Sequence, residues 1–315
     1  MANFLNSIKR GQSAKPPRIM MIGVEGVGKS TAGACMPDPV FICGESGLVG
    51  PQFNDTASFT PRSWAEVLGF VDELAANPSG FKTLVIDTLD WLEPMLYAHV
   101  CAKASTTAKK VESIEDFGFG KGYVQAVQEA RQLLVRLDRL QDAGFAVLIL
   151  AHSAIKMFNN PTGDNYDRYI PKCNEKVAGL FREWCDAVLF AMFDTYTVGG
   201  RDGKGKGAGG QTRIVHTTHS FGWDGKNRYS LPEVMPLDMP TIMEAIGAGK
   251  SSSDVDAMLK ELETLLVHID PAKAEKTRAW VAAGKYTPQT LAQVINKCRC
   301  EAEAANLNEN EVANA

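Results

Sequence analysis

The sequence predicts an α/β fold, a mostly parallel sheet flanked by helices, with a small helical region at the C-terminal end. Three observations predict it. The 315 residues are 45% hydrophobic, which is enough to bury one large core. Short apolar runs alternate with helical patterns, as in the βαβ units that build parallel sheets. Near the N-terminus, one such run leads through a glycine-rich turn into a helix-compatible segment.

Apolar runs bounded by turn residues predict the strands. The carboxyl ends of parallel strands share one edge of an open sheet, where ligands bind. Three runs end at or just before a polar residue, Glu45, Asp87 or His152, so we expect these side chains to converge at that edge. The predicted strands are residues 18–23, 39–43, 82–87, 145–152 and 186–193.

Two crossover helices are predicted between the strands. Residues 63–80 begin at a serine N-cap and end at Asn-Pro-Ser-Gly. Residues 122–144 repeat apolar side chains every three or four positions and close at a glycine. The glycine-dense residues 199–210 are expected to form a mobile hairpin tip, followed by further strands within 211–232.

Composition divides the chain into a core and two smaller parts. Residues 1–250 form the predicted core, and the Gly- and Ser-rich stretch 247–254 is interpreted as a hinge. Three short helical patterns follow within 251–303, and residues 304–315 are expected to form a disordered tail. The seven cysteines lack C-x-x-C spacing, which favours reduced thiols over a metal site.

The segment GVEGVGKST, residues 23–31, matches the phosphate-binding pattern G-x-x-x-x-G-K-[ST]. In such a P-loop, glycines let backbone N–H groups turn toward phosphates. Lys29 is expected to reach the β- and γ-phosphates of ATP, and the Ser30 hydroxyl to bind Mg²⁺. The alternative is an ordinary glycine-rich turn. The residues predicted to contact the nucleotide are Gly23, Gly26, Gly28, Lys29, Ser30 and Thr31.

Three further residues are candidates for the chemistry. Asp87 ends an apolar run and is predicted to anchor Mg²⁺ together with Ser30, with Asp90 as its competitor. Glu45 is a candidate general base for an attacking water, and a solvated loop glutamate is the alternative. His152 would place a neutral donor at the same edge, unless it is a structural histidine.

The order of these parts resembles that of the RecA-type ATPases. Within that group the chain is similar to the phage-encoded, shortened RecA-like nucleotide-binding proteins, which include the Sak group of single-strand annealing proteins. The resemblance covers about residues 15–240. It is carried by the segments GVEGVGKST, ICGESG, KTLVIDTLDWLE, GFGKGY, VLILAHS and DGKNRYSLP.

The resemblance implies roles for several residues. Glu45 matches the catalytic glutamate of RecA-type sites, and His152 holds the position of a γ-phosphate-sensing glutamine. Lys226 and Arg228 match a Lys-x-Arg finger that reaches the neighbouring subunit's γ-phosphate. Residues 153–172 match a DNA-contacting loop, for which an active-site lid is the alternative. The loop residues implied to meet phosphates or bases are Lys156, Phe158, Tyr166, Arg168, Tyr169 and Lys172.

The resemblance therefore implies a RecA-like core that hydrolyses ATP with Mg²⁺, assembles with itself into a ring or filament, and acts in phage DNA recombination or single-strand annealing. The implied partners are single-stranded DNA and a single-strand binding protein. The net charge of −4 argues against a surface coated for nucleic acid. Any DNA contact must then come from a local basic loop or from repetition across an oligomer.

Two other functions stay open. One is a binding module that ATP switches without turnover, and the other is a P-loop small-molecule kinase. A kinase needs an arginine-bearing lid and an acceptor pocket, and the late Lys-x-Arg favours the oligomeric ATPase. No run approaches the roughly 18 apolar residues of a membrane span, and the N-terminus lacks a signal-like stretch. We therefore expect no membrane partner and a cytoplasmic location, in the bacterial host of a phage.

Overall fold

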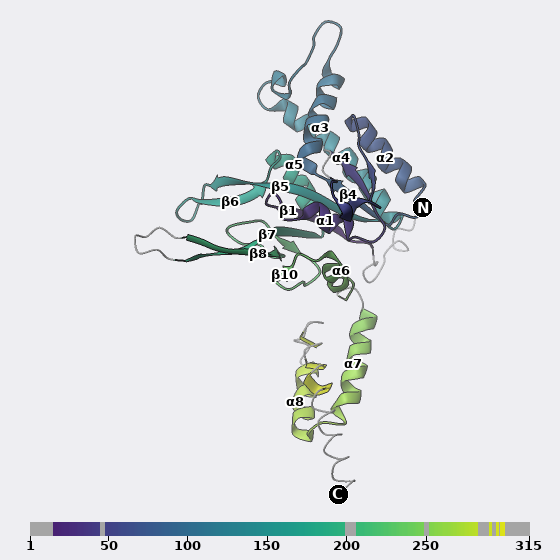
Figure 1. Ribbon diagram of the computed structural model, residues 1–315, viewed down its shortest axis with the longest axis vertical. Coiled ribbons are helices and arrows are strands. Elements are labelled where there is room, and N and C mark those ends of the chain that lie inside the picture. The colour runs from purple at the N-terminus through teal and green to yellow at the C-terminus, as the bar shows by residue number, and fades with distance from the viewer. Residues whose placement is uncertain are drawn as a thin grey trace, which may run out of the picture. The chain divides into compact units, whose positions relative to one another are not determined.

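The computed structural model describes residues 15–44, 48–198, 206–248, 252–282, 290–291, 294–295 and 297–299. The chain divides into two compact units, Met1–Met243 and Glu244–Ala315, and each is described by itself. The first unit contains the sheet and the helices packed on it (Figure 1). Residues 199–205 of the tip expected at 199–210 and the tail expected at 304–315 lie outside the described residues.

Ten strands of the described residues form one mixed sheet in the order β10-β8-β7-β1-β5-β4-β2-β3, with β6 paired to β5 and β9 paired to β7. The neighbours from β7 to β3 run parallel, whereas β6, β8, β9 and β10 pair antiparallel. The carboxyl ends of β1, β5, β4 and β2 therefore share one edge. The strands are β1 (Arg18–Gly23), β2 (Pro39–Cys43), β3 (Ala57–Phe59), β4 (Thr83–Asp87), β5 (Ala146–Phe158), β6 (Tyr166–Pro171), β7 (Ala187–Val198), β8 (Lys206–His216), β9 (Lys226–Asn227) and β10 (Val234–Pro236).

Helices cover both faces of this sheet. One face packs on α2 to α5 through a buried cluster that includes Trp64 and Phe181. On the other face, α1 lies so close that a Cβ added to Gly33 would be 3.0 Å from the side chains of Phe41 and Val85. The helices of this unit are α1 (Lys29–Ala34), α2 (Trp64–Ala76), α3 (Leu89–Ala104), α4 (Lys121–Asp142) and α5 (Glu175–Trp184), with short 3₁₀ turns at Pro51–Phe53 and Ile114–Phe117.

Local sequence explains the central elements. Strands β1 and β4 are buried along almost their whole length, as expected for parallel strands covered on both faces. Helix α2 begins where the Ser63 hydroxyl oxygen accepts a hydrogen bond from the Glu66 backbone N–H. Its inner face buries Val71 completely, which contributes about 1.5–3 kcal/mol relative to exposure.

The predicted α/β fold is confirmed, and the five predicted strands are β1, β2, β4, β5 and β7. The prediction was wrong about residues 153–172, because β5 continues past His152 to Phe158 and β6 returns beside it. Most of this segment is thus a β-hairpin rather than a loop, and it extends beyond the helices that cover the sheet (Figure 1). Residues 206–210 of the tip expected at 199–210 instead belong to β8, which begins at Lys206.

The second unit is helical. Helix α6 (Met239–Ala248) leads into it, and α7 (Ser252–Leu266) and α8 (Pro271–Ala282) lie within it. Its small core includes Leu262, Leu266 and Leu291. Throughout the described part of the chain, no helix has the length and apolar character that crossing a membrane requires.

Candidate nucleotide-binding site

The P-loop joins β1 to α1 and depends on its glycines. Gly26 and Gly28 have positive φ angles of 72° and 102°, which favour glycine. Gly23 faces β7 so closely that a Cβ there would lie 2.8 Å from the Ala191 carbonyl oxygen. No side chain caps the start of α1. The backbone N–H groups of its first turn therefore remain available to an anion.

Lys29 is held inside this loop. Its side chain is almost completely buried, and Nζ donates hydrogen bonds to the carbonyl oxygens of Gly23 and Val24, both at 3.1 Å. These contacts orient the ammonium group over the P-loop. A positive charge thus lies where the pattern predicts contact with phosphates.

Asp87 and Ser30 meet at the end of β4. Asp87 is 6% exposed, and the Ser30 hydroxyl and the Lys29 ammonium group both act on its carboxylate. Burial raises the pKa of Asp87, and the Ser30 hydrogen bond and the Lys29 charge offset only part of this rise. One hydroxyl and one carboxylate fit Mg²⁺, which takes oxygen ligands and usually keeps waters or substrate phosphates. Ser30 and Asp87 would hold the ion.

Asp90, the competitor of Asp87, has a different partner. Its carboxylate accepts hydrogen bonds from the His152 backbone N–H and from ring Nδ1, both at 2.9 Å. Burial alone would raise the pKa of Asp90, but the hydrogen bonds from His152 outweigh burial and lower it. His152 pairs with Gly23 across β5 and β1, which places this Asp–His pair beside the P-loop.

The Asp90 contact limits what the His152 ring can do. A carboxylate only accepts, so Nδ1 carries the proton, as assigned from its partner. In the neutral ring, Nε2 is then an acceptor. The predicted neutral donor is therefore incompatible with this arrangement, and a donor at Nε2 requires the imidazolium form.

The position of Glu45 lies outside the described residues. The residue before it, Gly44, donates its backbone N–H to the Asp87 carbonyl oxygen at 2.8 Å. A Cβ on Gly44 would lie 2.6 Å from Cβ of Trp91 on α3. The chain thus enters the Glu45 segment next to Asp87.

Lys226 and Arg228 lie near the amino ends of β1 and β7, opposite the carboxyl ends where the P-loop begins. Lys226 Nζ donates to the Glu183 carbonyl oxygen at 2.7 Å. Arg228 pairs with Asp186 at 3.1 Å, and the same carboxylate binds Arg18 at the start of β1. The P-loop follows the carboxyl end of β1. Neither residue of the Lys-x-Arg motif therefore lies at the P-loop of its own subunit.

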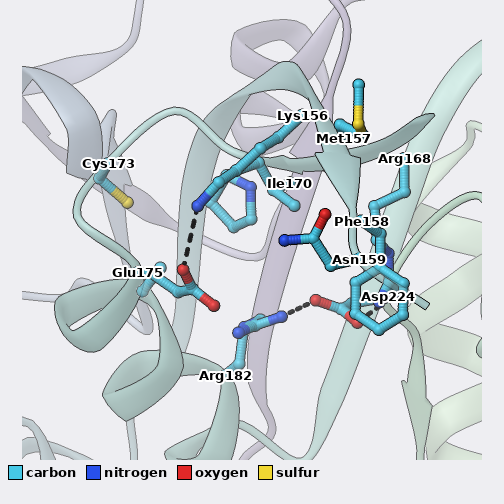
Figure 2. Close-up of a pocket in the computed structure, with 12 residues that line it drawn as sticks. Lys156, Met157, Phe158, Asn159, Arg168, Ile170, Cys173, Glu175, Arg182 and Asp224 are labelled. Carbon is cyan, nitrogen blue, oxygen red and sulfur yellow. Dashed lines mark hydrogen bonds and ion pairs between the residues drawn. The ribbon is translucent and has the colours of Figure 1, made fainter. Parts of the chain in front are cut away.

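The β5–β6 hairpin and α5 enclose a cavity of about 410 Å³. Figure 2 shows Lys156 pointing toward Glu175, at 3.2 Å, and Arg182 pointing toward Asp224. Arg168 also binds Asp224, at 2.7 Å, and its side chain is only 12% exposed. Charges that the sequence suggested for DNA are thus partly neutralised within the chain.

The remaining predicted contacts of the hairpin differ in accessibility. Lys172 is mostly exposed, and its Nζ lies 3.8 Å from Glu25 of the P-loop. Phe158 and Tyr166 pack against each other with ring centroids 5.2 Å apart. The Tyr169 ring packs on Phe190 of β7 at 4.9 Å, so it contributes to the core rather than offering a free face for a base.

Sequence reasoning missed Arg213 on β8. A Cβ built on Gly28 would lie 2.8 Å from Arg213 Nη1, so the guanidinium covers the P-loop. Its sequence context, an arginine in the strand-like run QTRIVH, gives no signal of this position. The Asp90–His152 pair was also missed, although both residues had been considered separately.

Comparison with known families agrees with this geometry. A family model described as an AAA domain, AAA_24, matches residues 15–229, which include the P-loop, Asp87, the hairpin and β8. No curated protein matches the chain. Because the family match covers well over half of the chain, the protein belongs to the AAA_24 family of P-loop AAA-type ATPase domains.

Proposed function

We propose that this protein binds ATP with Mg²⁺ at its P-loop and hydrolyses it. The observation that supports this most is the buried Asp87 carboxylate at the end of β4, whose pKa is influenced by both Ser30 and Lys29 of the P-loop. The end of β4 and the P-loop thereby offer together the two oxygen groups that suit Mg²⁺. When bound, Mg²⁺ would neutralise charge on the β- and γ-phosphates.

Lys29 would supply a second charge for the phosphates. Its ammonium group rests on two neutral carbonyl oxygens, those of Gly23 and Val24. Phosphate oxygens are charged acceptors and form stronger hydrogen bonds. The ammonium group would therefore move to a bound triphosphate, while the turn at Gly26 and Gly28 keeps backbone N–H groups directed at it.

Hydrolysis also needs a base and a sensor of the γ-phosphate. We assign the base to Glu45, because the chain enters that segment beside Asp87. We assign the sensor to His152 in its doubly protonated form, since only then does Nε2 donate. Asp90 would orient the ring through its bond to Nδ1.

We further propose that the protein assembles with itself and acts on single-stranded DNA, in phage recombination or strand annealing. The distance of Lys226 and Arg228 from their own P-loop supports a role across a subunit interface. The hairpin supports DNA contact, because the side chains of Lys156 and Lys172 are both mostly exposed and could meet phosphates. A single-strand binding protein is the proposed second partner, and the bacterial cytoplasm the proposed location.

The test measures ATP hydrolysis and particle size together, with and without single-stranded DNA. We expect the wild type to hydrolyse ATP, to form larger particles with ATP, and to turn over faster with DNA. Lys29→Ala should lose all three, while Arg62→Ala, an exposed substitution away from the site, should keep them.

Other outcomes identify the rival functions. A change in particle size without turnover would indicate an ATP-switched binding module. Transfer of phosphate to a small acceptor would indicate a kinase. A rate of ATP hydrolysis that changes neither with DNA nor with protein concentration would refute the proposed role in recombination. The proposed ATPase activity would still stand.

A further inference from the structure

Arg213 is an exposed cation next to the P-loop. It lies on β8, which is separated from β1 by β7, and it pairs with Phe193 across the β7–β8 ladder. The Ala191 position, two residues earlier on β7, pairs with Gly23 at the start of the P-loop. Along β7, the partner of Arg213 lies two residues past the partner of Gly23. Arg213 is therefore placed near the carboxyl end of β1, where the P-loop begins.

The guanidinium group reaches the residue that precedes Lys29. A Cβ on Gly28 would be 2.8 Å from Arg213 Nη1 and 3.7 Å from Cζ. A side chain at position 28 would displace the flexible guanidinium group and strain the left-handed backbone. Gly28 makes room for the arginine as well as for the turn.

The Arg213 guanidinium also lacks an opposing charge. Among the described residues no carboxylate forms an ion pair with it, whereas Arg18, Arg168, Arg182 and Arg228 each bind an aspartate. A cation over the P-loop that has no opposing carboxylate in the described part of the chain is available to a bound anion. Charge and position together indicate a phosphate ligand.

We propose that Arg213 contacts the terminal phosphates of the nucleotide bound in its own subunit. This inference rests on the proposed binding of ATP at the P-loop. The planar guanidinium offers paired N–H donors that match phosphate oxygens, which the single ammonium group of Lys29 cannot do. Arg213 thereby distinguishes nucleotides that carry β- and γ-phosphates from those that do not.

The test is equilibrium binding of MgATP, MgADP and AMP to the full chain, with Arg213→Ala and Arg213→Lys. Loss of hydrogen bonds to a charged group should weaken MgATP binding by about 10- to 100-fold in Arg213→Ala. AMP binding should stay within about twofold, since AMP lacks the phosphates in question. Arg213→Lys should recover part of the loss, because it keeps the charge but not the paired donors.

The matched control is Arg131→Ala, which removes an exposed arginine from α4 and should bind all three nucleotides like the wild type. Thermal unfolding of each variant without nucleotide shows whether the fold is intact. Wild-type affinity for MgATP in Arg213→Ala would overturn the inference alone, as would an equal loss of AMP and ATP binding. Absence of nucleotide binding in both the wild type and Arg131→Ala would instead overturn the proposed function, and this inference with it.

Discussion

Replacing Asp87 by asparagine should make the protein more stable and less active at the same time. The Asp87 side chain is buried, and its pKa is raised because burial outweighs the stabilising contacts from Ser30 and Lys29. At neutral pH the ionised carboxylate therefore destabilises the fold in the absence of nucleotide. Asparagine keeps the shape and can still accept the Ser30 hydrogen bond, but it carries no charge.

The expected gain follows from the direction of this pKa shift. A carboxyl group with a raised pKa contributes stability that is present below its unfolded pKa of about 3.9 and is lost as the pH rises through the folded pKa. Asp87→Asn should remove that loss. We expect a gain of about 0.5–2 kcal/mol at pH 7.5, as for other relieved functional sites. In a unit of this size, each 1 kcal/mol raises Tm by about 2–4 °C.

The same change should harm catalysis, because one of the two proposed Mg²⁺ ligands loses its charge. We expect Mg²⁺-dependent turnover to fall by about 10²- to 10³-fold, the usual effect of losing one electrostatic contact in an active site. Nucleotide binding in EDTA should change little, since Lys29 and the P-loop backbone are intact.

Thermal unfolding at pH 7.5 and at pH 4, with and without Mg²⁺ and ATP, separates these effects. Without nucleotide, the Tm gain should be present at pH 7.5 and should shrink at pH 4. Asp55→Asn, at an exposed position, serves as the control and should show neither change. A lower Tm for Asp87→Asn at pH 7.5, or an equal loss of binding and turnover, would refute the reasoning and give Asp87 a structural role.

Two further variants test the base and the hairpin. Glu45→Gln should bind ATP and assemble normally while hydrolysis falls by about 10²- to 10⁴-fold, measured as phosphate release, and near-normal turnover would transfer the role to Asp90. Changing Lys156 and Lys172 together to alanine should reduce the log–log salt slope of single-stranded DNA binding by about 1.4, or roughly 0.7 for each lost phosphate contact, without reducing basal hydrolysis. An unaltered slope would favour the lid interpretation.

The nucleotide site could be predicted largely from sequence because its parts are local. The spacing of glycines and Lys29 fixes the P-loop within a few residues, and β4 delivers Asp87 at a strand end. The sequence leaves Asp87 and Asp90 as alternatives, since both lie near the carboxyl end of β4. The structure gives them different partners, the P-loop residues Ser30 and Lys29 for Asp87 and His152 for Asp90.

Contacts between distant segments explain what sequence missed. Residues 153–158 continue β5 because they find a partner in β6, and only the paired ladder shows this. Helix α3 was not predicted although Leu89, Leu92 and Leu96 recur at helical spacing and are buried, because Pro94 in its interior disfavours a helix. Arg213 is 185 positions from Gly28, so the topology of β7 and β8 alone brings it to the P-loop.

Arg213 and Arg228 make opposite predictions for mixed assemblies. Arg213 lies at its own P-loop, so a subunit without it has a defective site whatever its neighbours carry. Arg228 lies near the amino end of β7, paired with Asp186. It can act on a nucleotide only if that nucleotide is bound by a neighbouring subunit. Its side chain is mostly exposed, so Arg228→Ala should cost little stability.

Mixing subunits with Lys29→Ala and Arg228→Ala creates junctions where an intact P-loop meets an intact Arg228. Hydrolysis should then exceed the sum of the two separate proteins, most clearly at concentrations where assembly is complete. Mixing Lys29→Ala with Arg213→Ala should give no such recovery, because no subunit carries both Lys29 and Arg213. Recovery in the second mixture would mean that Arg213 acts on a neighbour. If verified mixed assemblies of Lys29→Ala and Arg228→Ala show no recovery, then Arg228 does not serve an adjacent site.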